Sequence, residues 1–239
     1  MRRKLIIVFI ILCSLVFIGH SQSFMSFGWS VEKMDKTEPF RKIIDDFNNH
    51  YSNNYIMTSS LKVPEILNGG VFGFKFDGKV ASVGLGFHTH LHVSTAEWAD
   101  SSGNEYITQL RLNHHGFTYW FGANIVHSDG FRMGPVFGMN FEQFRTKLRD
   151  SKDFIYAHPV YPVDIFYFSF TFKFPFSFGN EDFTFDIIPY YQLPLYNMKL
   201  SKLHDKLNVG HATPYTKDEL KFNPASYGII LTLNFPFKL

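Results

Sequence analysis

The sequence predicts an all-β fold, a closed antiparallel up-and-down barrel of about eight strands, with ten strands as the alternative. The main observation is the stretch from Asp164 to Phe178, where Phe occupies every second residue from Phe166 onward. Alternate side chains of a strand point to opposite faces, so this is one strand with an all-Phe face and a mostly polar face. A second observation is that similar alternation continues, almost without a break, from residue 69 to the C-terminus.

The composition also favours strands over long apolar helices. The 239 residues include 29 Phe, and aromatic residues make up 18%, yet the mean hydropathy is only −0.08. After residue 21, no apolar run approaches the roughly 20 residues of a membrane-spanning helix. The length suits one domain with at most a small appendage.

The first 21 residues have the pattern of a secretory signal peptide. A basic start at residues 2–4 precedes the apolar run Leu5–Ile18, and Gly19 and Ser21 are small residues that predict cleavage before Gln22. An uncleaved N-terminal anchor is the alternative. These residues are excluded from the fold prediction.

Charge and cysteine content exclude several functions. The formal net charge of +2 becomes −1 without the three basic residues at positions 2–4. The remaining chain therefore lacks the excess of basic residues that would indicate nucleic-acid binding. The single cysteine is Cys13, inside the expected signal peptide. Acylation of Cys13 is disfavoured because Leu12, rather than a small residue, precedes it. The processed chain then has no cysteine, which excludes disulfides, thiolate metal sites and thiol catalysis.

Residues 22–68 form an N-terminal segment with an amphipathic helix at about 38–51. Thr37 is a candidate N-cap and Pro39 suits the first turn. Apolar residues follow at three- and four-residue spacing, which predicts one apolar helix face. Because acidic and basic residues balance on the other face, packing of this helix against the barrel is preferred over a position in the membrane interface.

Residues 69–239 are the expected barrel. The expected strands are 71–76, 80–95, 106–113, 117–126, 131–142, 164–178, 183–193 and 226–239. The ten-stranded alternative adds 24–31 and 55–63.

Turns and loops are expected at the two ends of these strands. Asp77-Gly78 and His114-His115-Gly116 are interpreted as turns. They are expected at the same end as long loops at about 143–162 and 197–224. The connections at 99–104, 127–130 and 179–182 are expected at the opposite end.

The polar face indicates that the Phe face points outward into lipid. A soluble barrel would turn its polar face to water, and this face would be rich in Lys and Glu. Here it consists mainly of Gly, Ser, Thr and Asn with a few charges, which suits the narrow interior of a barrel. Unpaired backbone groups are costly in lipid, so the sheet must close. A secreted soluble barrel with the Phe face inward is the alternative.

The chain resembles the small outer-membrane β-barrel proteins of Gram-negative bacteria, particularly those of the Bacteroidetes type. The features that match are the Gln22-Ser23 start, the absence of cysteine after the signal, and the terminal strand YGIILTLNFPFKL. In that class the last strand usually ends in an aromatic residue, whereas this chain ends in Leu239 after Phe235 and Phe237. The resemblance implies a multi-pass barrel in the outer membrane. Its implied partners are outer-membrane lipid and, through the last strand, the barrel-assembly machinery.

The histidines at 88, 90 and 92 are the sharpest candidate for chemistry, because they share one strand face. Residues two apart on a strand are about 6.7 Å apart and residues four apart about 13 Å. His88 and His90, or His90 and His92, could share a metal ion, but all three could not. Polar filling of the lumen is preferred, so no metal and no cofactor is expected. The lumen candidates are His88, His90, His92, Arg111, Arg132, Glu142, Asp164, Lys173 and Asp186.

The expected function is a structural, adhesive or assembly role in the outer membrane, without catalysis. An envelope protein is a further candidate partner. A barrel that transports or binds a small ligand is the first alternative, since the charges could line a polar channel. A lipid-modifying enzyme is the second, since His92 and Ser94 are two residues apart and could meet at one rim.

Overall fold

The computed structural model describes residues 22–151, 158–180, 182–210 and 213–237. The expected signal peptide lies outside the described residues. In chain order the elements are β1 (Gln22–Met34), α2 (Glu38–Asn54), β2 (Ile56–Ser59), β3 (Ile66–Asp77), β4 (Ala81–Ala99), β5 (Glu105–Ala123), β6 (Val126–Ser128), β7 (Phe131–Met133), β8 (Val136–Ser151), β9 (Val160–Lys173), β10 (Phe176–Gly179), β11 (Thr184–Pro194), β12 (Met198–Lys199), α3 (Ser201–Leu207), β13 (Lys221–Phe222) and β14 (Ser226–Pro236).

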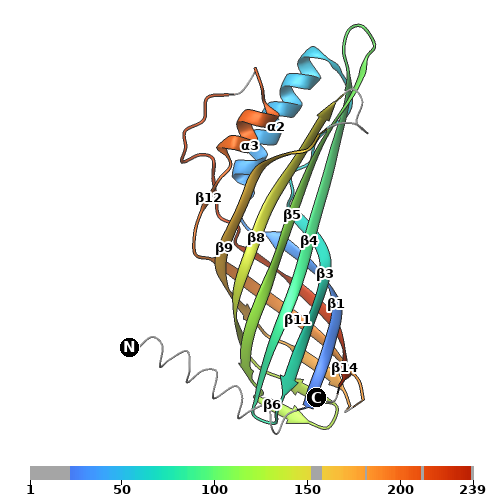
Figure 1. The fold of residues 1–239 in the computed structure, drawn as a ribbon, viewed down its shortest axis with the longest axis vertical. Coiled ribbons are helices and arrows are strands. Elements are labelled where there is room, and N and C mark those ends of the chain that lie inside the picture. The colour runs from blue at the N-terminus through green and yellow to red at the C-terminus, as the bar shows by residue number, and fades with distance from the viewer. Residues whose placement is uncertain (1–21, 152–157, 181, 211–212, 238–239) are drawn as a thin grey trace.

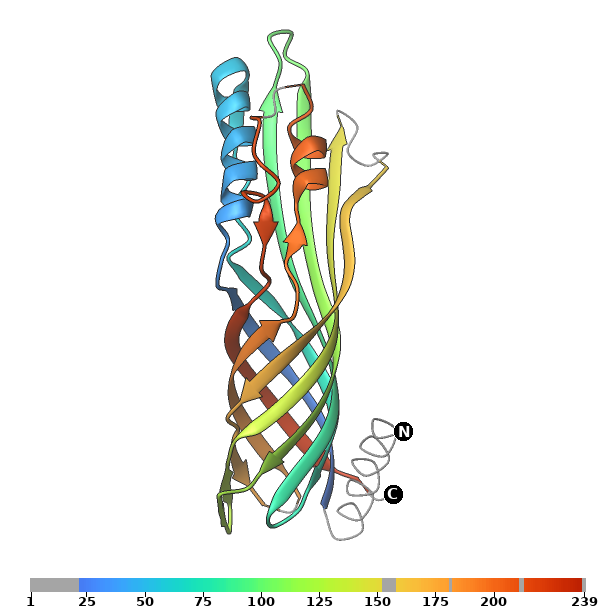
Figure 2. The same cartoon turned by 90° about the vertical axis from the view of Figure 1, so that its left-hand side faces the viewer.

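Eight long strands form one antiparallel ring of pairings. The order is β14-β1-β3-β4-β5-β8-β9-β11, and β11 also pairs with β14. Each of these strands therefore has a hydrogen-bonded neighbour on both sides, and Figures 1 and 2 show the tilted strands wrapping around a central axis. The prediction of an all-β antiparallel fold is confirmed. Among the described residues, neither helix is long and apolar enough to cross a membrane.

The expected and observed ring strands differ in two ways that together leave their number at eight: one strand is added and two expected strands are merged. β1 pairs with both β3 and β14, so the ring begins ahead of residue 69, where the barrel was expected to start. The turn expected at His114-His115-Gly116 was wrong, because these residues lie in the middle of β5, which merges two expected strands. The expected loop at 143–162 was too long, since β8 continues to Ser151 and β9 begins at Val160. β2 pairs only with β4 and lies off the ring.

Four connections, including the two that carry helices, leave one end of the ring, here called the cap end. They are residues 35–65 with α2, the β4–β5 turn at 100–104, the β8–β9 connection, and residues 195–225 with α3. The opposite end, here called the turn end, has residues 78–80, the connection with the small β6–β7 hairpin, and the β9–β11 connection with β10. The expectation that 77–79 and 99–104 lie at the cap and turn ends, respectively, was wrong. It followed from the false turn in β5, which reversed the direction of every strand before it.

Strand β9 shows how the ring divides its two faces. Phe166 and Phe168 point outward and are 59% and 50% exposed, whereas Tyr167 and Ser169 are each 2% exposed. The Phe face therefore points outward, as the sequence predicts. Similar outward side chains on every ring strand form an apolar belt, which includes Phe27, Trp29, Phe72, Leu85, Phe87, Phe117, Phe121, Met139, Phe141, Phe166, Phe168, Phe172, Tyr191, Leu193, Ile229, Leu231, Leu233 and Phe235.

The hydrophobic core lies at the cap end, and not inside the ring at the level of the apolar belt. α2 begins with Pro39 in its first turn, as expected, and extends beyond the expected end to Asn54. Its buried face packs with α3 and with the inner faces of the ring strands where they extend past the belt. This set, here called the cap core, includes Phe40, Ile43, Ile44, Phe47, Leu110, Leu112, Phe144, Leu148, Leu203, Leu207 and Phe222. The preference for packing α2 against the barrel is confirmed.

Candidate functional site

Five titratable side chains meet inside the ring, just below the cap core. Glu32 comes from β1, His88 and His90 from β4, His114 from β5, and Glu142 from β8. Alternation turns both β4 histidines inward. Register brings His90 directly opposite His114, and Gly116 directly opposite Glu142. These five residues are called the His–Glu cluster.

His114 lies between the two carboxylates of the cluster. Its Nδ1 is 3.0 Å from Oε1 of Glu32, and its Nε2 is 3.4 Å from Oε2 of Glu142. The exposed fractions of Glu32, His114 and Glu142 are 1%, 1% and 0%. Burying a carboxylate is costly unless it is paired and hydrogen-bonded, so His114 is the shared partner that holds both in place.

The other two histidines each contact one carboxylate. His88 Nε2 is 2.9 Å from Oε2 of Glu142, and His90 Nδ1 is 3.2 Å from Oε2 of Glu32. The His90 Nδ1 atom is buried and lacks a hydrogen bond among the described residues, because its approach to Glu32 is not aligned for one. The other nitrogen of the His90 imidazole, Nε2, is 2.5 Å from Oγ of Ser30.

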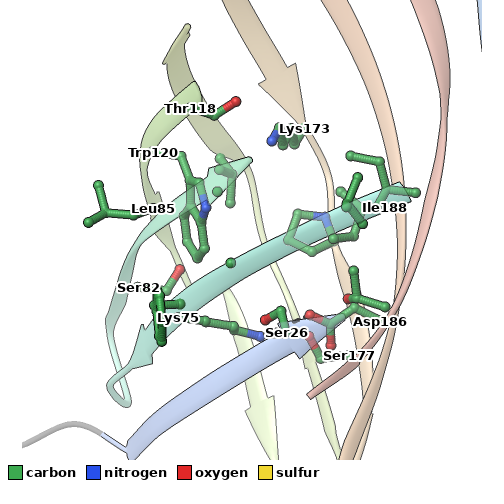
Figure 3. Close-up of a pocket in the computed structure, with 18 of the residues that line it drawn as sticks. Ser26, Lys75, Ser82, Leu85, Thr118, Trp120, Lys173, Ser177, Asp186 and Ile188 are labelled. Atoms are coloured by element: carbon green, nitrogen blue, oxygen red, sulfur yellow. Dashed lines mark hydrogen bonds and ion pairs between the residues drawn. The ribbon is translucent and has the colours of Figure 1, made fainter. Parts of the chain in front are cut away.

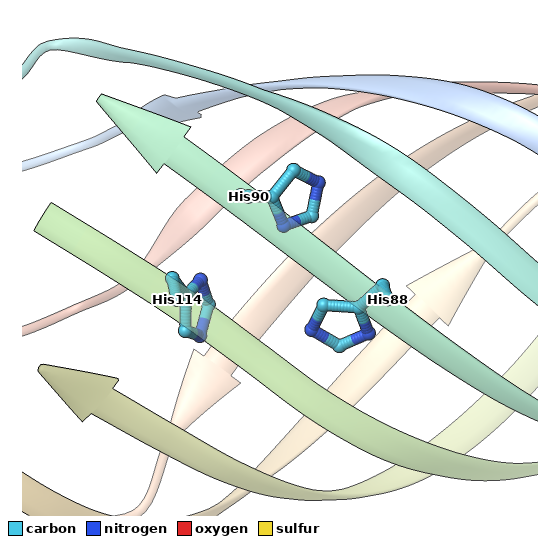
Figure 4. Close-up of side chains that lie close together, drawn as sticks. All are labelled: His88, His90 and His114. Atoms are coloured by element: carbon cyan, nitrogen blue, oxygen red, sulfur yellow. The ribbon is translucent and has the colours of Figure 1, made fainter. Parts of the chain in front are cut away.

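Neutral hydroxyl groups complete the surroundings. The Tyr190 hydroxyl donates to Oε2 of Glu32 at 3.2 Å, and Ser169 donates to Oε1 of Glu142 at 3.4 Å. The Tyr167 hydroxyl is 2.7 Å from Nε2 of His114. One nitrogen from each of His88, His90 and His114 lies within 4.8 Å of the others, and Figure 4 shows the three rings gathered across β4 and β5.

A second charged group lies nearer the turn end. Lys75 Nζ is 3.0 Å from Oδ2 of Asp77 and 3.2 Å from Oδ2 of Asp186. Arg132 Nη1 is 3.0 Å from the same oxygen of Asp77. The two cations and two carboxylates balance, so this group is a neutral brace across the interior.

A cavity of about 100 Å³ separates the brace from the His–Glu cluster. His88 and Lys173 line it on the cluster side, and Lys75, Ser177 and Asp186 line it on the other side. Figure 3 shows Lys173 and Asp186 on different sides of this space, with Trp120 between strands on its wall. The volume holds a few water molecules and is too small for a wide channel.

Seven of the nine lumen candidates lie on the inner face. They are His88, His90, His92, Arg132, Glu142, Lys173 and Asp186. Of these, His88, His90 and Glu142 meet in one cluster. His92 lies nearer the cap end of β4, where its Nδ1 is 3.3 Å from the Ile66 carbonyl oxygen. Ser94, its expected partner at a rim, accepts a hydrogen bond from the Lys62 backbone at 2.6 Å.

The assignment of Arg111 and Asp164 to the lumen was wrong. Asp164 is two residues from Phe166, so it shares the outward face, where Arg145 Nη2 lies 2.8 Å from its Oδ2. Arg111 lies between Leu110 and Leu112, both of which point into the cap core. Polarity is thus reversed at the cap end: the apolar side chains point inward and the charged ones outward.

Several residues of the interior were missed from the sequence. Glu32 was missed because the optional strand at 24–31 was expected to end before it, although Ser30 and Glu32 are alternate buried residues of β1. His114 was missed because it was placed in a turn. Lys75 and Asp77 were missed because the prediction considered only the Phe residues of their strand and a turn after it. Continuous alternation through 105–123 was the signal that could have found His114.

Comparison with known proteins gives fold-level likeness only. No family model matches the chain, and no curated protein matches its sequence. Among solved structures, Ail, the attachment invasion locus protein of Yersinia pestis in complex with the heparin analogue sucrose octasulfate, has a TM-score of 0.48 and 10% identity, covering 91% of this chain and 99% of Ail. The outer membrane protein OprG of Pseudomonas aeruginosa has a TM-score of 0.42 and 9% identity, covering 93% of this chain and 99% of OprG.

The outer membrane protease OmpT of Escherichia coli has a TM-score of 0.34 and 8% identity, covering 91% of this chain and 96% of OmpT. At these values no function is carried from the three proteins to this chain. The strand pairings of this chain themselves define its fold. The Bacteroidetes type of barrel stays a prediction.

Proposed function

We propose that this protein is a non-conducting, non-catalytic outer-membrane β-barrel that presents an ordered cap at the cell surface for a structural or adhesive role. The observation that carries the proposal is the cap core, which lies across one end of the ring. α2 and α3 pack there against the inner faces of the strands. A ring covered in this way at one end is suited to contacting other molecules through the cap rather than to letting solutes pass through the lumen.

The apolar belt supports the membrane part of the proposal. Its side chains are large and solvent-exposed on all sides of the ring, for example Phe72 on β3, Phe141 on β8 and Leu231 on β14. A soluble monomer rarely exposes so continuous an apolar surface. An outward apolar band on a ring of antiparallel strands is the pattern of outer-membrane barrels.

The interior supports the absence of conduction. An eight-stranded ring has an interior just wide enough for side chains to fill. Here the His–Glu cluster and the Lys75 brace cross it at two levels, and the cavity between them is about 100 Å³. Ions would have to pass both levels and the cap core.

Planar-bilayer recording tests conduction directly. The purified protein, folded in detergent and shown to be heat-modifiable on a gel, is added to a bilayer, with a porin as the positive control. We expect no discrete current steps from this chain. Reproducible steps that scale with protein concentration would contradict the proposal and would support transport through the lumen.

Cysteine labelling on whole cells tests the orientation. The processed chain has no cysteine, so single substitutions are unambiguous. Ser101→Cys lies at the β4–β5 turn of the cap end, and Asp129→Cys lies at the β6–β7 turn of the turn end; both positions are exposed. A membrane-impermeant maleimide should label Ser101→Cys on intact cells and Asp129→Cys only after permeabilisation. The reverse pattern, or a soluble periplasmic protein, would overturn the surface location of the cap.

A further inference from the structure

We propose that the His–Glu cluster is a binding site for one divalent transition-metal ion, with Zn²⁺ as the reference ion. The ligands would be one ring nitrogen from each of His88, His90 and His114, with one carboxylate oxygen of Glu32 or Glu142 as the fourth ligand and the other carboxylate beside the site. This proposal is independent of the role proposed for the cap. It concerns only what the interior of the ring binds.

The spacing of the three nitrogens brings them within reach of a single ion. They lie within 4.8 Å of one another, and a Zn²⁺ ion with bonds of about 2 Å needs its ligand atoms about 3.3 Å apart in a tetrahedron. Binding would therefore require the imidazole rings to turn so that their nitrogens approach one another from within 4.8 Å to about 3.3 Å. His88, His90 and His92 lie too far apart along one strand to share an ion, but His114 comes from the neighbouring strand and lies directly opposite His90.

His90 shows the arrangement expected of a metal-binding histidine. A ligating imidazole usually uses its second nitrogen to bond a fixed neighbour, which sets the ring orientation. His90 Nε2 is 2.5 Å from Ser30 Oγ, while Nδ1 points into the cluster without a hydrogen bond. The side chain is 2% exposed, so this nitrogen, which has no hydrogen bond and lies 3.2 Å from Oε2 of Glu32, is screened from solvent. It is the group for which a metal ion provides the missing partner.

The charge of the cluster also fits a divalent cation. Two carboxylates and three neutral imidazoles carry a charge of −2, which one divalent ion balances. Nitrogen ligands favour Zn²⁺ and neighbouring transition metals, whereas Ca²⁺ and Mg²⁺ prefer shells made of oxygen. On the turn-end side the cluster borders an open space, because His88 also lines the cavity of about 100 Å³.

The alternative is that protons, not a metal, balance the two carboxylates. In that case His114 serves as a protonated bridge between Glu32 and Glu142. Both interpretations use the same contacts, so the test must detect the ion itself.

Metal binding can be measured on the full processed chain, folded in detergent, without a polyhistidine tag and stripped with a chelator. Equilibrium dialysis with Zn²⁺ should give one ion per chain by elemental analysis. Co²⁺ should give the visible absorption bands of a site with nitrogen and oxygen ligands. Folded protein that binds less than 0.2 equivalents of Zn²⁺ at about 100 µM free ion would overturn the proposal.

Neighbouring histidines of β5 provide a matched pair of variants. His114→Asn removes an inward ligand, whereas His115→Asn changes the next residue, which points outward and contacts Gln143. We expect His114→Asn to lower the affinity at least tenfold and to abolish the Co²⁺ bands, and His115→Asn to leave both unchanged. Equal loss or equal retention in the two variants would contradict the assignment.

A second variant covers the case in which His114→Asn does not fold. His90→Gln keeps an amide that can contact Ser30 while removing the nitrogen without a partner, and it should likewise lower the affinity. The wild-type Co²⁺ spectrum needs no variant. Ion binding at many weak surface sites, unaffected by His90→Gln, would mean adventitious metal only and would reject the site.

Discussion

His114 Nδ1 lies 3.0 Å from Oε1 of Glu32, although the two residues are 82 positions apart and their strands are not neighbours. β3 and β4 stand between β1 and β5 in the ring. A direct side-chain contact between strands three steps apart means that the interior is narrow at this level. The same contact links the first ring strand to the middle of the chain.

Glycine is needed at position 116 because the Glu142 carboxylate occupies the space that a Cβ would fill. A Cβ at this inward position would collide with the Glu142 carboxylate and approach the His88 ring. We expect Gly116→Ala to push Glu142 away from its histidines and to lower the free energy of unfolding by about 1–3 kcal/mol. Urea unfolding followed by tryptophan fluorescence measures this change.

The control for Gly116 is Gly86, another inward glycine. A Cβ at Gly86 meets only the Phe72 carbonyl oxygen, at 3.6 Å, which is an ordinary contact. Gly86→Ala should therefore change the stability by no more than about 0.5 kcal/mol. A similar loss in both variants would mean that strand propensity, not the cluster, decides the effect.

Phe40 should be a main contributor to cap stability. Its side chain is fully buried, and its ring centroid is 4.9 Å from that of Phe222 and 6.2 Å from that of Phe144. Phe40→Ala removes a large buried side chain and should cost about 3–5 kcal/mol in the cap. We expect faster proteolysis of the cap, while the ring keeps its heat-modifiable migration. Ile56→Ala, at a position 68% exposed, should leave proteolysis unchanged.

Leu231 tests whether the belt faces lipid. It is the central one of five outward side chains of β14, from Tyr227 to Phe235. In vesicles, Leu231→Arg should lower the free energy of unfolding by about 2–4 kcal/mol, as for a cation at the bilayer midplane. Ile56→Arg, on β2 at the cap end, should have an effect near zero. Equal small effects at the two positions would argue that the belt is not in a bilayer.

Glu219 gives the cap a predictable response to acid. The Thr216 backbone N–H, with Lys42 and the Thr216 hydroxyl, lowers the pKa of this carboxyl from 4.5 to about 2. Because the folded-state pKa lies below the unfolded value, the contribution of Glu219 is fully present above pH 4.5 and is lost as the pH falls toward 2. The Thr216 amide chemical shift should therefore show an inflection near pH 2, which Glu219→Gln removes. An inflection near pH 4.5 would contradict the contact.

Prediction from the sequence was most successful for the parts of the strands whose outward side chains form the apolar belt. The alternation of Phe166 to Phe172 placed the outward face correctly, and the spacing of Phe40 to Phe47 located α2 correctly. Prediction was least reliable beyond the belt, where Leu110 and Leu112 point inward and Arg111 outward. The local pattern is the same alternation in both regions, so only the three-dimensional position along the strand decides which face is buried.

The interior cluster could be predicted only in part, for a different reason. His88 and His90 share one strand and are visible as a local motif. Glu32, His114 and Glu142 come from three other strands, and their meeting depends on the register of four pairings. Gly116 misled the prediction because a glycine can mark either a turn or, as here, a close approach by another side chain.

The two cap helices come from opposite ends of the ring sequence. α2 follows β1 directly, and α3 precedes β14. Asn208, just after α3, donates to the Ile43 carbonyl of α2 at 3.1 Å, and Thr213 Oγ1 donates to Asp46 of α2 at 2.9 Å. These hydrogen bonds hold α2 and the segment that follows α3 together within the cap. The cap core therefore combines residues from the beginning, middle and end of the ring sequence, so it can form only after all of these segments are present in the chain.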